Sequence, residues 1–404
     1  MHHMDFKAAQ ALLLDKVVPV GTEPVPLAQC GGRILASDLT AAESIPPFDR
    51  SPYDGYAFRA ADSAAASEET PVTLTILEDV PAGAVPTKAV TPGTATKILT
   101  GAPIPAGADA VTPYEWTRFD ENSVTLLRSY RAGDNIVRTG EDVVAGQVLA
   151  KKGDRIDGGT AGTLAAQGET QPLVYRRLRV GILSTGNEVI EADEALRPGK
   201  IRNSNRHTLE TVLTSLGFEP VYLGLAGDNV ENIAALLKKG LESCDAILST
   251  GGVSVGDYDL TPDAMERAGI EVLVRGVALK PGMACAYGVK EGKLVCGLSG
   301  NPASSMTNFY AVALPALRKA AGWHSPCYQE FDVTLLEDFR KKSPVTRLLR
   351  GTLDLTGGTV GIHLPQDQGN VVLSSTIGCN VMAIVPGGTG PVPKNTTLKG
   401  FLLV

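Results

Sequence analysis

The stretch that decides the fold is Asp245-Ala-Ile-Leu-Ser-Thr-Gly-Gly-Val-Ser-Val-Gly-Asp-Tyr-Asp259. Its apolar beginning, residues 246–248, predicts a strand buried on both faces of a parallel sheet. The glycines after it let backbone N–H groups approach an anion closely, and the carboxylates are ligands that Mg²⁺ prefers. Because open α/β sheets bind ligands beyond the carboxyl ends of their strands, we predict a site for a phosphorylated ligand and a divalent metal. The residues of this stretch that we expect at the site are Gly251, Gly252, Ser254, Gly256, Asp257 and Asp259.

Strands and helices alternate on both sides of this stretch, between residues 178 and 326. Apolar runs predict strands at 179–183 and 221–225 and near residues 272 and 294. Helical spacing predicts helices at 204–216, 230–241 and 262–268. Asn301 as cap and Pro302 as first residue begin a longer helix, which we expect to continue to residue 321. This alternation predicts a doubly wound α/β domain.

Two more loops follow predicted strands of this domain. Residues 184–188 read STGNE, and residues 297–305 read GLSGNPASS. The second loop leads directly into a helix N-terminus, where free N–H groups and the helix dipole favour an anion. We expect all three loops at one edge of the sheet, so they predict a single ligand site. The chain has no Gly-x-Gly-x-x-Gly and no P-loop, which disfavours an ordinary dinucleotide or NTP enzyme.

Charged residues near the predicted strand ends are candidates for metal and oxyanion binding. Glu188 and Asp228 follow strands, as do the two aspartates of the deciding stretch. Lys280 ends another strand and could neutralise an oxyanion. A solvated surface charge is the alternative interpretation for Asp228 and for Lys280.

Composition limits the class of protein. A chain of 404 residues exceeds one compact core, so two to four domains are expected. The net charge of −7 argues against nucleic acid as the main partner, and no apolar run is long enough to span a membrane. No export signal is visible at the N-terminus. Six scattered cysteines without a Cys-x-x-Cys pair favour reduced thiols, so we expect a cytoplasmic protein.

The regions on either side of the α/β pattern lack its alternation of strands and helices. From residue 48 to 144, and again after residue 326, short alternating segments punctuated by glycine and proline predict β structure. Residues 46–57 and 100–109 are rich in turn residues. A tight turn and a rigid proline loop are their plainest interpretations.

Taken together, these segments resemble the molybdopterin molybdenumtransferase family, which comprises bacterial MoeA and the homologous C-terminal part of gephyrin. They occur in family order and cover essentially the whole chain. The matching segments are 47–57 (PFDRSPYDGYA), 100–109 (TGAPIPAGAD), 140–142 (GED), 184–188 (STGNE), 204–205 (SN), 251–259 (GGVSVGDYD), 280–282 (KPG) and 300–302 (GNP).

The resemblance implies a multidomain protein of α/β and β structure that forms an elongated homodimer. Its expected parts are a linking domain at 1–46 and 145–177, a β-rich domain at 47–144, a molybdopterin-binding α/β domain at 178–326 and a C-terminal β-barrel at 327–404. It also implies the reaction. Family members insert molybdate into adenylylated molybdopterin and release AMP, with Mg²⁺ required. Molybdopterin adenylyltransferase, apo-molybdoenzymes or their chaperones are the implied partners besides the second subunit.

Roles for individual residues follow from the same resemblance. In this family the cleft forms between the α/β domain of one subunit and the β-rich region of the other. Asp54, Thr100, Glu188 and Lys280 are the expected catalytic residues, and Asp228, Asp257 and Asp259 are the expected metal ligands. The expected substrate-binding residues are Asp142, Ser184, Thr185, Gly186, Ser204, Gly251, Gly252, Ser254, Gly256, Gly300, Asn301, Pro302, Arg350 and Ser375.

The chain departs from the family pattern at a few positions. Gly276 replaces a basic residue that many relatives carry, Met283 replaces the second lysine of Lys-Pro-Gly-Lys, and Ser299 replaces a proline. Each missing positive charge is expected to cost on the order of 1 kcal/mol in the binding of a dianion such as molybdate.

Two alternative functions compete with the insertion reaction. One is a molybdopterin-binding or scaffolding paralogue without turnover. The other is molybdopterin adenylyltransferase, whose fold resembles residues 178–322. The enzyme is favoured by the presence of Asp54, Glu188, Asp257, Asp259 and Lys280, because a protein that only binds the pterin would not need a metal cluster.

Overall fold

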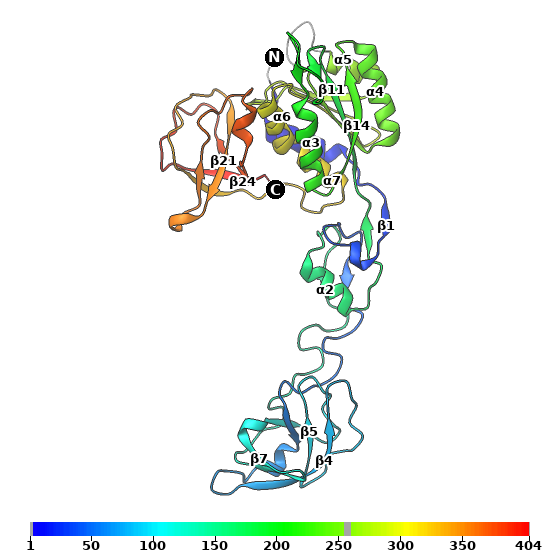
Figure 1. Ribbon diagram of the computed structural model, residues 1–404, viewed down its shortest axis with the longest axis vertical. Coiled ribbons are helices and arrows are strands. Elements are labelled where there is room, and N and C mark those ends of the chain that lie inside the picture. Colours follow the sequence, from blue (N-terminus) through cyan, green and yellow to red (C-terminus); the bar gives the residue numbers. More distant parts are fainter. Residues whose placement is uncertain (1–2, 254–259, 404) are drawn as a thin grey trace. The chain divides into compact units, whose positions relative to one another are not determined.

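The computed structural model describes residues 3–253 and 260–403. The chain divides into two compact units, each described here by itself (Figure 1). Unit 1 comprises Met1–Ser37, Lys152–Ala161 and Gln171–Val404, and unit 2 comprises Asp38–Lys151 and Gly162–Thr170. The predicted α/β and C-terminal β regions therefore both belong to unit 1.

A six-stranded sheet forms the centre of unit 1, with the strand order β14-β11-β15-β19-β18-β16. Four strands run parallel: β14 (Glu219–Ala226), β11 (Arg179–Thr185), β15 (Ala246–Thr250) and β19 (Lys293–Leu298). The predicted doubly wound sheet is thus confirmed. The strand predicted near residue 272 is also present, as β16 (Glu271–Arg275). It is joined to the sheet by β18 (Ala286–Lys290), a strand that was not predicted and that pairs antiparallel with both β19 and β16.

Helices cover both faces of this sheet, because successive strand residues point to opposite sides. On one face Ile182 and Leu248 pack with α1 (Phe6–Lys16) and α3 (Ser204–Ser215). On the other face Leu183 and Ile247 pack with α4 (Val230–Ser243) and α5 (Thr261–Arg267). Burial on both sides explains why the strands read as unbroken apolar runs.

The helix expected from residue 302 to 321 is not continuous. It consists of α6 (Pro302–Asn308), a π-helical segment (Phe309–Ala313) and α7 (Leu314–Ala320). Pro315 has no N–H group and so cannot bond to the carbonyl of Ala311. The N–H of Leu314 reaches back to the carbonyl of Phe309, which gives the wider turn.

The C-terminal β region forms a closed barrel. Its strands are β20 (Phe331–Leu335), β21 (Thr346–Asp354), β22 (Gly361–His363), β23 (Val381–Val385) and β24 (Thr397–Leu402), and the pairing of β21 with β23 closes it. A two-residue strand, β17 (Leu279–Lys280), runs parallel to β21. Lys280 therefore ends a strand of the barrel sheet rather than of the α/β sheet.

Short paired strands complete unit 1. They are β1 (Thr22–Pro24) with β10 (Leu173–Tyr175), and β12 (Val189–Ile190) with β13 (Ile201–Arg202). Helix α2 covers Gly158–Ala166.

Unit 2 is built from β structure around an aromatic core that includes Tyr56, Phe58 and Tyr130. Its main sheet has the order β6-β3-β5-β4-β8-β7. The strands are β3 (Gly55–Phe58), β4 (Val72–Val80), β5 (Thr94–Ile98), β6 (Ala110–Pro113), β7 (Thr117–Phe119) and β8 (Ser123–Leu126), while β2 (Leu39–Thr40) pairs with β9 (Val148–Ala150).

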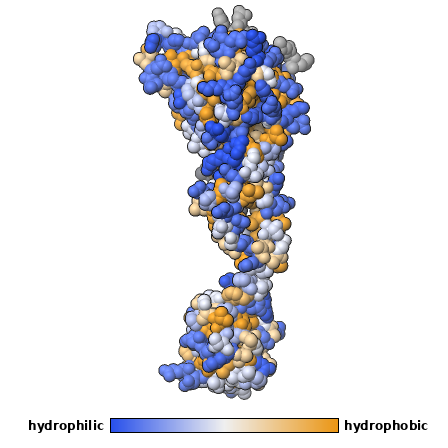
Figure 2. Space-filling view, turned by 90° about the vertical axis from the view of Figure 1, so that its right-hand side faces the viewer, coloured by the Kyte–Doolittle hydropathy of each residue, from blue (hydrophilic) through white to orange (hydrophobic). Residues whose placement is uncertain are grey.

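Hydrophobic and hydrophilic residues are mixed over the face shown in Figure 2. Within the described residues, no helix combines the length and the apolar character that crossing a bilayer requires.

Candidate functional site

A cleft of about 580 Å³ lies at the carboxyl ends of β11, β15 and β19. We call it the main cleft. The three loops that the sequence places at one sheet edge do meet here. Of the expected site residues, Ser184, Thr185, Glu188, Ser204, Gly251, Gly252, Gly300, Asn301 and Pro302 line it. Sequence reasoning missed Arg202 and Asn203 in its wall, and also Val371 and Leu373, which come from the barrel.

The glycines of the deciding stretch are required by close backbone packing. Gly251 has φ +98°, and a Cβ atom there would lie 2.7 Å from Oγ1 of Thr185. Gly252 has φ +63°, and its Cβ would lie 2.7 Å from Oγ1 of Thr261. Larger residues would clash and would strain the backbone, so only glycine lets this turn form the floor of the cleft.

Hydrogen bonds join the three loops to one another. The side-chain amide of Asn205 donates to the carbonyl of Gly300 at 2.8 Å. The hydroxyl of Thr185 donates to the carbonyl of Thr250 at 3.1 Å. The walls of the cleft are therefore held by side chains of α3 and β11 as well as by the sheet itself.

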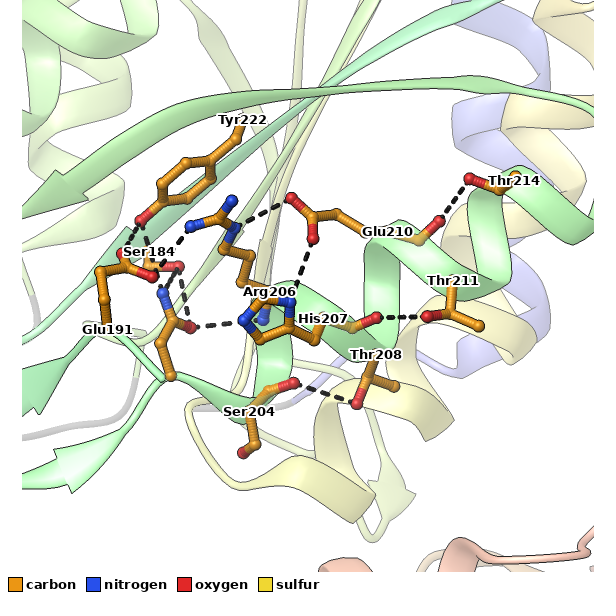
Figure 3. A network of polar contacts seen from close by, with 11 residues as sticks. Ser184, Glu191, Ser204, Arg206, His207, Thr208, Glu210, Thr211, Thr214 and Tyr222 are labelled. Atoms are coloured by element: carbon orange, nitrogen blue, oxygen red, sulfur yellow. Dashed lines mark hydrogen bonds and ion pairs between the residues drawn. The ribbon is translucent and has the colours of Figure 1, made fainter. Parts of the chain in front are cut away.

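A network of buried and half-buried polar residues stands behind one wall (Figure 3). Asn203, which is 4% exposed, donates to Oγ of Ser184 at 2.9 Å, and its Oδ1 accepts the N–H of Arg206 at the start of α3. Arg206 pairs with Glu191 at 2.9 Å and stacks on the ring of Tyr222 at 3.7 Å. The network fixes Ser184 relative to the first turn of α3.

The ionisable groups of this network shift one another's pKa values. Burial and the hydrogen bond to Glu191 raise the pKa of Tyr222 to about 12. Burial raises the pKa of Glu191, but hydrogen bonds from Tyr222 and Arg206 outweigh it, so the pKa lies below its usual value. Glu191 thus carries a charge that Arg206 neutralises, while Tyr222 stays protonated at neutral pH.

The carboxylates Glu188 and Asp228 stand at adjacent strand ends. The backbone N–H of Asn187 donates to Oδ2 of Asp228 at 3.1 Å, and Oδ1 of Asn187 accepts the N–H of Asp228 at 3.2 Å. Gly186, at φ +127°, leaves space for the Glu188 carboxylate, because a Cβ there would lie 2.6 Å from Oε2. Asn187 is a positioning residue that the sequence pattern did not single out.

Several expected residues lie outside the described residues, namely Ser254, Gly256, Asp257 and Asp259. Among the described residues, no three carboxylate, thiol or imidazole groups gather as a metal site. The metal role of Asp228 stays a prediction.

A second cleft of about 390 Å³ adjoins the main cleft and shares Ala284, Ser299 and Asn301 with it. Three basic residues line it: Lys280, Lys341 and Arg347. No carboxylate belongs to its described lining residues. Burial lowers the pKa of Arg347, and its Nε atom has no hydrogen-bond partner in the described part of the chain. This second cleft suits a small anion of two negative charges.

The departures from the family pattern have a local explanation. Met283 lines the second cleft, where Lys341 and Arg347 from the barrel supply positive charge. Gly276 has φ +79°, and an added Cβ would contact the ring of His3. The backbone at this position therefore favours glycine over a basic residue.

Arg350 and Ser375 line neither cleft. Arg350 is 3% exposed and donates to Oγ of Ser375 and to the carbonyl of Gly369 at 2.9 Å. Burial lowers its pKa. These bonds hold the loop 367–375, which supplies Val371 to the main cleft and Gln368 to the second. Their contact with substrate stays a prediction.

The remaining expected residues belong to unit 2. The N–H and the hydroxyl of Thr100 both donate to Asp54, and these bonds lower the pKa of that exposed carboxyl group. The structure therefore brings together two residues that lie far apart in the sequence. Asp142 is exposed, and its N–H donates to the carbonyl of Ile45 at 3.0 Å.

Comparison with known proteins agrees with this geometry. Residues 4–168 match the MoeA N-terminal region (domain I and II), and residues 181–319 match the probable molybdopterin binding domain. The molybdopterin molybdenumtransferase of Bacillus subtilis is 38% identical over 393 residues, covering 95% of this chain and 90% of the relative. The chain belongs to the molybdopterin molybdenumtransferase family. The enzyme of that name from Staphylococcus epidermidis is 37% identical over 95% of this chain and 91% of its own length.

A solved structure of the family shares the whole fold. The molybdopterin biosynthesis MoeA protein from Pyrococcus horikoshii OT3 matches with a TM-score of 0.86 and 31% identity, over 99% of this chain and 100% of that chain. The resemblance drawn from the motifs is confirmed, and so is the predicted fold class.

Proposed function

We propose that this protein inserts molybdate into adenylylated molybdopterin and releases AMP in a Mg²⁺-dependent reaction. The observation that carries the proposal is the shared rim of the two clefts at Ala284, Ser299 and Asn301. The main cleft has the glycine loops expected for a phosphorylated ligand, and the second has the charge expected for molybdate. Adjacent binding sites favour a reaction between two bound substrates, because both are held at short range.

The chain's own residues supply the binding. Lys280, Lys341 and Arg347 attract the dianion into the second cleft. In the main cleft, the glycine turn at 251–252 leaves the floor free of side chains, so that a ligand can approach the backbone. Lys280 would stabilise charge that develops on an oxyanion as the phosphoanhydride breaks. Val371 and Leu373, which are exposed, add apolar surface to one side of the main cleft.

The carboxylates fit a magnesium ion. Glu188 lines the main cleft, and Asp228 is oriented by Asn187. Mg²⁺ is bound in proteins by one or two carboxylates together with substrate phosphates and waters, so a dedicated cage of protein ligands is not needed. When bound, the ion would offset negative charge on the phosphoanhydride.

The test is AMP release from purified adenylylated molybdopterin with Mg²⁺, with and without molybdate. Molybdate-stimulated release and metal-loaded pterin support the proposal. Tight binding without AMP release would instead identify a scaffolding protein. ATP consumption in the presence of free molybdopterin would identify an adenylyltransferase. Glu188→Gln, which removes the charge but keeps the shape, should abolish Mg²⁺-dependent release while leaving the melting temperature near that of the wild type.

A further inference from the structure

The main cleft holds one positive charge that neither the motifs nor the family comparison assigns. Among its described lining residues only Glu188 and Arg202 are charged. Arg202 is exposed to solvent, and no ion pair to it is found among the described residues. Within the described part of the chain, its side chain makes one hydrogen bond, a long contact of 3.4 Å from Nη2 to the carbonyl of Glu194. The other N–H groups of this guanidinium can therefore donate to an anionic ligand in the cleft.

The backbone around Arg202 is fixed on both sides. The N–H of Ile201 donates to the carbonyl of Glu188 at 2.9 Å, and the N–H of Asn203 donates to the carbonyl of Ile190 at 2.8 Å. These bonds hold β13 against β12. Arg202 therefore projects from a short sheet and not from the exposed loop at 192–200 that precedes it.

The network of Figure 3 anchors that short sheet to the rest of unit 1. Asn203, the residue after Arg202, is tied to Ser184 and caps α3. Glu191, the residue after β12, is held by Arg206 and by the hydroxyl of Tyr222. Because β12 and β13 run parallel, Asn203 and Glu191 secure the same, C-terminal end of both strands, through buried and part-buried polar contacts. This end carries Arg202, so the base of its side chain is fixed before a ligand arrives.

We propose that Arg202 binds a phosphate group of the substrate in the main cleft. A guanidinium presents paired N–H donors that match two phosphate oxygens, and such charge-assisted bonds are stronger than neutral ones. The inference rests on the proposed function for the identity of the ligand. It adds a substrate-binding residue and a preference for phosphorylated over unphosphorylated pterins.

The test measures binding of three probes to the full chain: adenylylated molybdopterin, molybdopterin and AMP. Arg202→Gln is compared with Arg197→Gln, which removes the same charge from an exposed position that does not line the cleft. We expect Arg202→Gln to weaken binding at least about tenfold and Arg197→Gln to change it less than about twofold. Arg202→Lys, which keeps the charge but loses the paired donors, should fall between them.

The three probes distinguish which phosphate is bound. If Arg202→Gln loses the same affinity for adenylylated molybdopterin and for molybdopterin, Arg202 binds the pterin phosphate. If its affinity for AMP also falls, Arg202 binds the nucleotide phosphate. Because charge contacts are screened, the binding constant of the wild type should also fall more steeply with salt than that of Arg202→Gln. A purely structural role would not alter this slope.

The outcomes separate the inference from the proposed function. Equal binding by Arg202→Gln and Arg197→Gln, with wild-type AMP release intact, would overturn the role of Arg202 alone. Binding that depends on Arg202 in a wild-type protein that releases no AMP would support that role and overturn the insertion reaction.

Discussion

Thr100 donates two hydrogen bonds to one oxygen of Asp54, from its N–H and from its hydroxyl, each 2.7 Å long. Together they favour the ionised carboxylate. The same arrangement occurs elsewhere in unit 2, where the N–H and hydroxyl of Thr139 donate to Asp49 at 2.8 and 2.9 Å. Asp54 is exposed, whereas Asp49 is half-buried and also pairs with Arg138. The shared threonine contacts allow the effect of losing one hydroxyl donor to be compared at the two aspartates.

We expect Thr100→Val to raise the pKa of Asp54 toward its ordinary value, since the hydroxyl donor is lost and the N–H donor remains. NMR titration of the Asp54 carboxyl carbon measures this, and Thr139→Val is the control that should move Asp49 and leave Asp54 unchanged. Because the folded-state pKa of Asp54 is lowered, its stabilising contribution is present above the unfolded pKa and is lost as pH falls through the folded one. A pKa unmoved by Thr100→Val would contradict the assignment.

We propose that the enzyme works as a homodimer in which the partner subunit's Asp54 completes each site. Asp54→Ala and Glu188→Ala should each be inactive alone. After mixing and reassociation, about half of the dimers carry one copy of each variant, and one of their two sites contains neither change. About a quarter of wild-type AMP release should therefore return. No recovery, in a sample shown to have exchanged subunits, would place both residues in one subunit.

The lining of the second cleft indicates which residues determine the molybdate concentration needed for half-maximal AMP release. Lys341→Met and Arg347→Met should each raise the molybdate concentration for half-maximal AMP release about fivefold to tenfold. Lys342→Met alters a neighbouring exposed lysine that does not line the cleft, so it should have little effect. Met283→Lys adds a charge to the lining and should lower the requirement. An unchanged requirement in both Lys341→Met and Arg347→Met would remove the barrel from molybdate binding.

Gly251→Ala tests the backbone turn at the floor of the main cleft. The new alanine would have a left-handed φ and a Cβ atom 2.7 Å from Oγ1 of Thr185. We therefore expect the free energy of unfolding to fall by well above about 1 kcal/mol and ligand binding to weaken. Gly388→Ala is the matched control, because Gly388 has φ +79° with nothing within 4 Å of the added Cβ. Its cost should be about 1 kcal/mol, without an effect on binding. Urea unfolding and ligand titration measure the two effects, and equal losses would show that the contact with Thr185 is unimportant.

The sequence predicted those features that depend on neighbouring residues along the chain. The apolar run of β15 and its glycine turn mark a buried strand and an anion loop without knowledge of the rest of the fold. The strand β18 was not predicted, because its five residues, AYGVK, hold a central glycine that interrupts a very short apolar pattern. The break at Phe309–Ala313 was missed because Pro315 lies inside an otherwise helical pattern.

Much of the site depends on contacts between distant segments. Asn203 and Arg202 gain their roles from Ser184 and from the cleft wall, and neither belongs to a motif that stands out alone. Arg347 and Lys341 come from the barrel, so their place beside Lys280 requires the pairing of β17 with β21. Local spacing cannot encode such proximity.

The loop 367–375 belongs to the walls of both the main cleft and the second cleft. Arg350 holds this loop through Ser375 and Gly369, and Val371 lines the main cleft while Gln368 lines the second. A ligand that moved this loop on entering one cleft would also change the shape of the other. By thermodynamic linkage such an effect would be reciprocal, with each substrate altering the affinity for the other by the same factor.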